Sequence, residues 1–173
     1  ILDGAGPMPE RDTVPLTAAH GRVLAAPLRA QLTQPPFDAS AMDGYAVRAA
    51  DVATLPATLR VVGESAAGHG FSGGIGAGEA TRIFTGAPVP RGADAIVIQE
   101  NATRDGDRVT VREGRIEAEH VRRAGGDFNV GDELIGSGHR LTARDITLAA
   151  AMGHAALEVV RRGHRRLPRL DDR

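Results

Sequence analysis

The middle of the chain consists of short β-prone segments separated by glycine and proline. Five such segments recur: GYAVR, TLRVVG, EATRIF, DAIVIQE and RVTVR. Glycine is densest between Gly63 and Gly92, which leaves little room for a stable helix. We therefore expect residues 37–120 to form a small β-rich domain with few helices.

The flanking segments have a different pattern. Residues 1–12 are rich in Gly, Pro and acids and are expected to be a poorly ordered lead-in. Thr17 is placed to cap a short helix that Pro27 stops, and the following LRAQLT alternates as a strand does. Near the other end, Thr142 and Gly153 are placed as the N-cap and the C′ glycine of a helix. A strand, AALEVV, is expected after that helix.

These patterns predict an α+β, β-rich protein of two small domains. An outer mixed domain is expected from residues 13–36 together with 121–160, and the β-rich domain is inserted into it. Residues 161–173 form a basic tail without apolar periodicity. The chain starts with Ile rather than Met, so we expect it to be part of a longer protein.

Composition excludes several classes of function. The chain has no Cys and no Lys, which removes disulfides, Cys-type zinc sites, P-loop lysines and Schiff-base chemistry. A net charge of −1 and 3% aromatic residues argue against a nucleic-acid partner. No apolar stretch is long enough to cross a bilayer, so no membrane partner is expected, and the absence of Cys is compatible with a cytoplasmic setting.

The segment GHGFSG at residues 68–73 matches the glycine pattern of dinucleotide-binding folds. That pattern requires a helix directly after it, whose N-terminus binds the pyrophosphate. Here GIGAG follows, and such a sequence does not hold a helix. We interpret residues 68–73 as a loop.

The sequence leaves two interpretations open for two other segments. These are PPFDASAMDGYAV at 35–47 and TGAPVPRGAD at 85–94. Ordinary turn chemistry explains both, with Asp43-Gly44 as a hairpin turn. However, Pro35 and Pro36 stiffen the approach to the first segment, and its small residues leave room for another surface to come close. The alternative is a functional loop.

Four segments occur together in this chain in a characteristic order: PPFDASAMDGYAV, RIFTGAPVPRGADAIVIQE at 82–100, VRRAGGD at 121–127 and GHRLTARDITLAAAMGHAALEVV at 138–160. Together they closely resemble the N-terminal region of the molybdopterin molybdenumtransferases, the MoeA and gephyrin E-domain family. The resemblance runs from about Thr13 to Val160, and SAMDGYA and TGAPVP are its specific motifs.

The resemblance implies a role in molybdenum cofactor biosynthesis. Enzymes of this family insert molybdate into adenylylated molybdopterin and release AMP, with Mg²⁺ as the assisting cofactor. The resemblance also implies a cytoplasmic homodimer in the full-length parent. Its active site would lie between the nucleotide-binding domain of one subunit and the N-terminal domains of the other.

The matched motifs also carry over the expected site residues. Asp43 matches the family's functional aspartate and is expected to orient molybdate or bind Mg²⁺. Thr85 matches the site threonine and is expected to donate a hydrogen bond to an oxo or phosphate oxygen. We expect six further residues to bind substrate or to support the site: Asp38, Ser40, Gly44, Gly86, Arg122 and Arg123.

The sequence departs from the family pattern in two places. Gly126 stands where the family usually has an acidic residue before the aspartate of an RRxGED-like turn. After AALEVV, the tail RRGHRRLPRLDDR does not match the expected start of a nucleotide-binding domain. We therefore expect this polypeptide to be inactive alone. The alternative function is a non-catalytic scaffold or assembly module of the same family.

Overall fold

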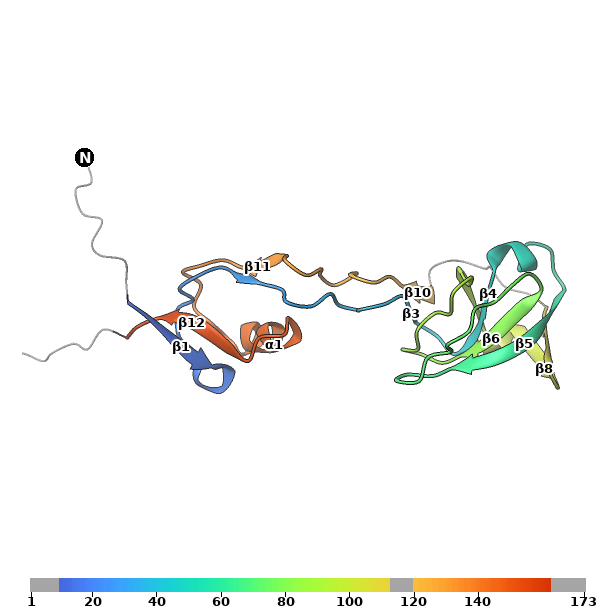
Figure 1. Ribbon diagram of the computed structural model, residues 1–173, viewed down its shortest axis with the longest axis horizontal. Helices are drawn as coiled ribbons and strands as arrows, with labels where there is room; N and C mark the ends of the chain where they lie inside the picture. The colour runs from blue at the N-terminus through green and yellow to red at the C-terminus, as the bar shows by residue number, and fades with distance from the viewer. Residues whose placement is uncertain (1–9, 113–119, 163–173) are drawn as a thin grey trace, which may run out of the picture. The chain divides into compact units, whose positions relative to one another are not determined.

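The computed structural model describes residues 10–112 and 120–162, which divide into two compact units (Figure 1). The inner unit is Thr33–Phe128, and the outer unit combines Ile1–Leu32 with Asn129–Arg173. Strands predominate and only one α-helix is present in the described residues, which confirms the expected β-rich α+β class. No helix in these two ranges is long and apolar enough to cross a membrane.

The inner unit is built on a six-stranded sheet in the order β7-β4-β6-β5-β9-β8. Only the β5–β6 pair is parallel, and every other neighbouring pair is antiparallel. The 3-10 helices η2 (Ala49–Val52) and η3 (Gln99–Asn101) connect its strands. The strands are β4 (Gly44–Val47), β5 (Ala57–Ser65), β6 (Glu79–Ile83), β7 (Ala95–Ile98), β8 (Ala102–Asp105) and β9 (Arg108–Val111).

The two faces of this sheet carry separate apolar clusters. Along β4, Tyr45 and Val47 belong to one cluster and Ala46 to the other, as the alternation of side chains in a strand requires. All four residues of β4 are buried, so this strand lies at the centre of the unit. Thr81 on β6 is also fully buried, and its hydroxyl has no hydrogen-bond partner among the described residues.

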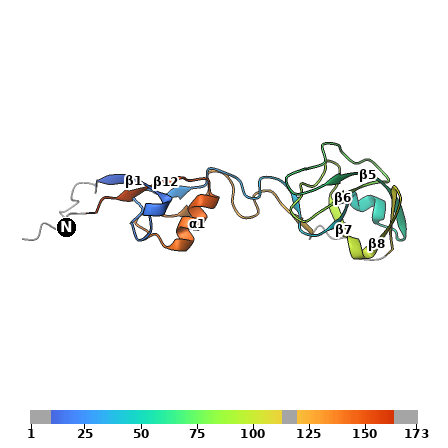
Figure 2. The ribbon, with the colours of Figure 1, turned by 90° about the horizontal axis from the view of Figure 1, so that it is seen from below.

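The described part of the outer unit contains two small strand pairs and the α-helix, of which β1, β12 and α1 are labelled in Figure 2. Strand β1 (Arg11–Pro15) pairs antiparallel with β12 (Ala156–Val160), and β2 (Leu28–Arg29) pairs with β11 (Glu133–Ile135). Helix α1 (Ala143–Ala151) contacts the 3-10 helix η1 (Leu16–Ala18) and contributes the fully buried Ala149.

Helix α1 begins and ends as the sequence predicts. The Thr142 hydroxyl accepts from the Asp145 N–H at 3.4 Å, and the Asp145 carboxylate accepts from the Thr142 N–H at 2.7 Å, which completes a capping box. At the other end, Gly153 has a φ of +94°, the left-handed conformation that favours glycine after a helix.

Three expectations for the first 33 residues differ from the structure. A helix does not continue from Thr17, because Gly21 turns the chain at φ +71° and Val23 and Leu24 then form bridges with strand-like segments. Residues 11 and 12, expected in a poorly ordered lead-in, belong to β1 instead, and residues 1–9 of that expected lead-in lie outside the described residues. Strand β2 covers only the first two residues of LRAQLT. Residues 163–173 of the basic tail lie outside the described residues.

The second domain boundary also differs from the predicted position near residue 121. Strand β10 (Val121–Arg122) pairs with β3 (Ala39–Ser40) inside the inner unit. The N–H groups of Gly125 and Asp127 then donate to the carbonyls of Pro35 and Gln34, both at 2.9 Å. These bonds tie residues 121–128 to the inner unit, so the chain crosses between units at 32/33 and 128/129.

Candidate functional site

The two motifs left open by the sequence lie side by side in the inner unit. Gly86 donates its N–H to the carbonyl of Ser40 at 2.8 Å, and Ser40 donates its own N–H to the carbonyl of Ala87 at 2.9 Å. Val89 likewise donates to the carbonyl of Asp38 at 2.8 Å. The backbone therefore fixes the SAMDGYA segment against the TGAPVP segment.

This pairing brings Asp43 and Thr85 into direct contact. One oxygen of Asp43, Oδ1, accepts from both the backbone N–H and the hydroxyl of Thr85, each at 2.8 Å. Asp43 is half-buried and Thr85 is exposed. The other carboxylate oxygen, Oδ2, has no partner in the described part of the chain. The site thus presents a fixed carboxylate with one oxygen available to a ligand.

Hydrogen bonding keeps this carboxylate ionised. The Thr85 N–H, followed by the Thr85 hydroxyl, lowers the pKa of Asp43 below its ordinary value, and the positive charge of Arg82 adds to the effect. Because the hydroxyl hydrogen of Thr85 is directed to Asp43, in this arrangement it does not point to a substrate oxygen as the sequence led us to expect.

Gly44 has a different role from the turn glycine of a hairpin. It is the first residue of β4 and its φ is not positive, so the Asp43-Gly44 turn interpretation is wrong. A Cβ at this position would lie 2.0 Å from the carbonyl oxygen of Val97 on β7. Only glycine lets the two strands approach this closely directly after Asp43.

Ser40 and Asp38 stabilise the loop that carries Asp43 through hydrogen bonds within the inner unit. The buried Ser40 hydroxyl donates to the carbonyl of Met42 at 2.6 Å and so shapes the turn before Asp43. Asp38 accepts from the Ala124 N–H at 2.8 Å and from the Arg123 guanidinium at 2.6 Å, and these two bonds, in that order, lower its pKa. Both side chains are committed to the protein itself.

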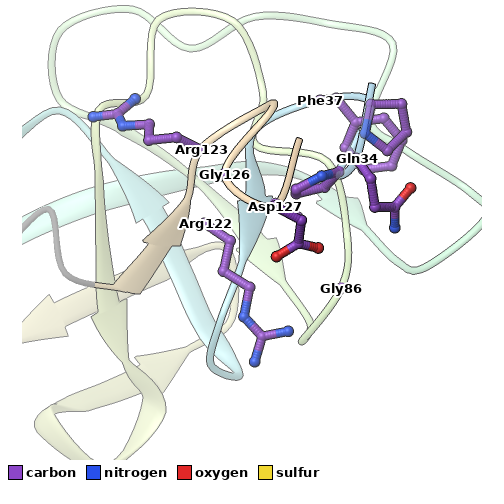
Figure 3. A pocket seen from close by; sticks show the side chains of 10 residues that line it. Gln34, Phe37, Gly86, Arg122, Arg123, Gly126 and Asp127 are labelled. Carbon is purple, nitrogen blue, oxygen red and sulfur yellow. The ribbon is translucent and has the colours of Figure 1, made fainter. Parts of the chain in front are cut away.

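Arg122 and Arg123 border a pocket of about 550 Å³ beside this loop (Figure 3). Arg123 is held by Asp38, whereas Arg122 has no partner among residues 10–112 and 120–162. In Figure 3 the side chains of Arg122 and Asp127 extend to the same side, and Arg123 extends away from them. Gly86, next to Thr85, forms part of the wall. Arg122 is therefore the better placed of the two arginines to meet an anion.

The glycine that departs from the family pattern sits in this same pocket. A Cβ at Gly126 would lie 3.1 Å from the carbonyl oxygen of Arg123, so a larger residue there requires a small shift of the turn. The neighbouring Asp127 is exposed and its carboxylate has no partner in the described ranges. The acidic character of the turn therefore depends on Asp127 here.

Arg82 is a residue that the sequence analysis missed. Its guanidinium lies over the rings of Tyr45 and Phe84, 5.2 and 4.8 Å from their centres, and donates to the Gly44 carbonyl at 3.2 Å. It therefore braces the start of β4 next to Asp43. Its position three residues before Thr85 was the available signal.

One other sequence candidate, the glycine-rich segment at residues 68–73, does not form a site. GHGFSG begins in a tight turn, with a bridge between Ala66 and His69, and no helix follows it. Within residues 10–112 and 120–162, no group of three or more His, Asp or Glu side chains is arranged to hold a metal ion. The loop interpretation of residues 68–73 is confirmed.

Comparisons with known proteins give one consistent result. The family model described as "MoeA N-terminal region (domain I and II)" matches residues 1–153. The chain is 38% identical over 157 residues to a molybdopterin molybdenumtransferase of Nostoc sp., covering 88% of this chain and 36% of that protein. It is 42% identical over 154 residues to molybdopterin molybdenumtransferase 2 of Mycobacterium tuberculosis, covering 87% and 38%.

Solved structures agree with the sequence relatives. A crystal structure of the molybdopterin biosynthesis MoeA protein from Pyrococcus horikoshii superposes with a TM-score of 0.82 at 32% identity, over 89% of this chain and 40% of that one. A second structure of that protein gives a TM-score of 0.79. The chain thus spans little more than a third of the length of the curated relatives it matches.

Proposed function

The chain belongs to the MoeA family, whose N-terminal region it matches, and on this premise we propose that it forms the N-terminal part of a molybdopterin molybdenumtransferase. The relatives' names support a role in molybdenum cofactor biosynthesis. The reaction we propose is the insertion of molybdate into adenylylated molybdopterin with release of AMP. We further propose that a nucleotide-binding domain from another subunit of a homodimer completes the site, so that this polypeptide does not turn over alone.

The contact between Asp43 and Thr85 is the observation that carries this proposal. Thr85 binds one oxygen of the carboxylate with two hydrogen bonds, and the other oxygen has no partner within residues 10–112 and 120–162. A carboxylate held in one orientation loses little further freedom when it binds a ligand. We assign Asp43 as the residue that orients molybdate or its metal ion, and Thr85 as the residue that positions Asp43.

The single available carboxylate oxygen of Asp43 suits a Mg²⁺ ion that takes most of its ligands from water and substrate. Mg²⁺ is commonly bound through one or two carboxylates, with the remaining positions filled by water and substrate phosphates. Asp43 supplies one such oxygen, and residues 10–112 and 120–162 hold no cluster that would supply three. Bound there, Mg²⁺ would neutralise charge on the phosphate and molybdate oxygens.

Arg122 completes the proposed site on the side of the pocket. Its guanidinium, which has no partner in the described part of the chain, can bind an incoming oxyanion in a bidentate manner, while Arg123 holds Asp38 and with it the loop. A substitution of Arg122 should therefore weaken substrate binding. A substitution of Arg123 should instead loosen the loop.

A binding experiment tests the proposal. The chain is mixed with a nucleotide-binding domain of the family and titrated with molybdate and Mg²⁺. Asp43→Asn should abolish binding with the fold intact, and Asp107→Asn, at an exposed position elsewhere in the inner unit, should not. Thr85→Ser should retain binding because it keeps both donors, and Thr85→Val should weaken it. Binding that is indifferent to Asp43→Asn would instead indicate the scaffold function.

A further inference from the structure

The outer unit contains a second pocket, which the proposed function does not use. It has a volume of about 290 Å³ and is bordered by four arginines, Arg22, Arg140, Arg161 and Arg162, with Gly21 and the end of β12. We refer to it as the arginine pocket. All four arginines lie in the outer unit and none belongs to the site around Asp43.

Backbone hydrogen bonds hold the walls of the arginine pocket in place. Gly21 donates its N–H to the carbonyl of Leu141 at 2.8 Å, and Leu141 donates to the carbonyl of Arg22 at 2.9 Å. On the other side, Val160 donates to the carbonyl of Val23 at 2.8 Å. Three segments that are distant in sequence therefore form one fixed frame.

Two of the four guanidinium groups are also fixed. The Arg22 side chain is only 11% exposed and donates to Asp12 Oδ2 and to the Val160 carbonyl, both at 3.0 Å. Arg161 donates to Asp12 Oδ1 at 2.9 Å and pairs with Glu10. Arg161, followed by Arg22, lowers the pKa of Asp12, so this carboxylate remains charged and bound to both arginines.

The other two guanidinium groups have no such partners. Arg140 and Arg162 are exposed, and neither has a hydrogen bond or an ion pair within the described residues. Among the residues that the structure describes, the carboxylates of Asp12 and Glu10 offset two of the four positive charges and leave two uncompensated. Exposure alone does not distinguish a binding site, because arginines that are simply solvated on a surface are exposed as well. They would not, however, share a cavity with two further arginines held in fixed positions.

We propose that the arginine pocket binds a small oxyanion of the phosphate class, either free or as the phosphate group of a small molecule. Guanidinium groups recognise phosphate oxygens with paired hydrogen bonds, and a bound dianion would offset the two surplus charges. The volume lies at the lower end of the range for ligand pockets, which suits a phosphate or pyrophosphate group rather than a large ligand.

Titration of the full 173-residue chain with inorganic pyrophosphate tests this assignment. Binding is followed by calorimetry and by ¹H–¹⁵N spectra, with sodium chloride used to hold the ionic strength constant. We expect saturable binding, with shifts at the amides of Gly21, Arg140 and Arg162. The double variant Arg140→Gln/Arg162→Gln should bind pyrophosphate about tenfold or more weakly, because it loses charge-assisted hydrogen bonds.

The matched control removes the same charge elsewhere. Arg108 and Arg144 are exposed and border no part of the pocket, so Arg108→Gln/Arg144→Gln should bind as the parent does. If the first double variant does not fold, Arg140→Lys/Arg162→Lys is used instead. It keeps the positive charges but loses the planar guanidinium groups that form paired hydrogen bonds. Weaker pyrophosphate binding by this variant supports the assignment, and unchanged binding contradicts it.

Three other results would overturn the proposal. The first is a spectrum that does not change with pyrophosphate. The second is an equal loss of binding in the two glutamine variants, which would indicate a general charge effect. The third is a single-stranded oligonucleotide that binds more tightly than pyrophosphate through Arg140 and Arg162, which would reassign the surface to nucleic acid.

Discussion

Replacing Gly44 with alanine should destabilise the inner unit far more than replacing a glycine whose added Cβ would meet no backbone atom. The new Cβ would lie 2.0 Å from the carbonyl oxygen of Val97 and 3.0 Å from the Cα of Ile98, both backbone atoms of β7. Ordinary contacts of a Cβ lie at 3.4–4 Å. Strands β4 and β7 would therefore have to separate by more than one ångström (~1.4 Å at the closest atom).

The expected cost follows from the paired strands. Residues 44–47 of β4 pair with residues 95–98 of β7, and separating them strains or breaks these hydrogen bonds. Overpacking alone typically costs about 1–3 kcal/mol, and each lost hydrogen bond adds about 0.5–1.5 kcal/mol. We expect the free energy of unfolding to fall by at least about 3 kcal/mol, which lowers the Tm of a unit this size by about 12 °C or more.

Tyrosine fluorescence during thermal unfolding measures this effect. The chain has one Tyr and no Trp, and Tyr45 is buried next to Gly44, so the signal reports the inner unit alone. The control is Gly76→Ala, whose Cβ would meet only the Glu79 carboxylate at 3.5 Å. A Tm for Gly44→Ala that matches the control would refute the close-approach argument.

Three further predictions concern single polar groups. Thr81→Val should raise the stability of the inner unit by about 1 kcal/mol, because it removes a buried hydroxyl that has no partner in the described ranges. Thr58→Val should not, because the Thr58 hydroxyl is hydrogen-bonded to that of Thr110. Thr142→Ala should destabilise α1 by about 1 kcal/mol, seen as faster amide exchange in that helix. The bonds from Thr142 and then His139 lower the pKa of Asp145 from 3.8 to about 2, so its contribution is present above pH 3.8 and is lost as the pH falls toward 2. Amide exchange in α1 should accelerate between pH 3.8 and 2 to a larger extent in the parent than in Asp145→Asn, which lacks this titrating group.

The parts of the fold that depend on local chemistry were predictable from the sequence. Thr142 and Gly153 fix the ends of α1 through their own caps, and both were identified correctly. The core strands of the inner unit also follow from their apolar and β-branched residues. In these segments local preference and tertiary packing agree.

The parts that depend on distant partners were not predictable. Strand β1 exists because residues 11–15 pair with residues 156–160, and the false helix after Thr17 fails because Val23 and Leu24 bridge to Arg140 and Val159. Nothing in a local window reveals these partners. Tertiary pairing overrides propensity in such cases.

The candidate site likewise contains residues that could be predicted from the sequence and residues that could not. Motif resemblance singled out Asp43 and Thr85 separately, and the structure places them in contact. The reason for Gly44, a close approach to Val97, required the neighbouring strand to be known. Arg82 was missed because its role arises from stacking on Tyr45 and Phe84.

Turnover in a chimeric enzyme is the most direct test of the central claim. Residues 10–160 of this chain replace the matching region of the full-length Nostoc relative, and AMP released from adenylylated molybdopterin is measured with and without molybdate. We predict molybdate-dependent release that Asp43→Asn abolishes and Asp107→Asn leaves unchanged. Full release from the Asp43→Asn chimera would contradict the role assigned to this carboxylate.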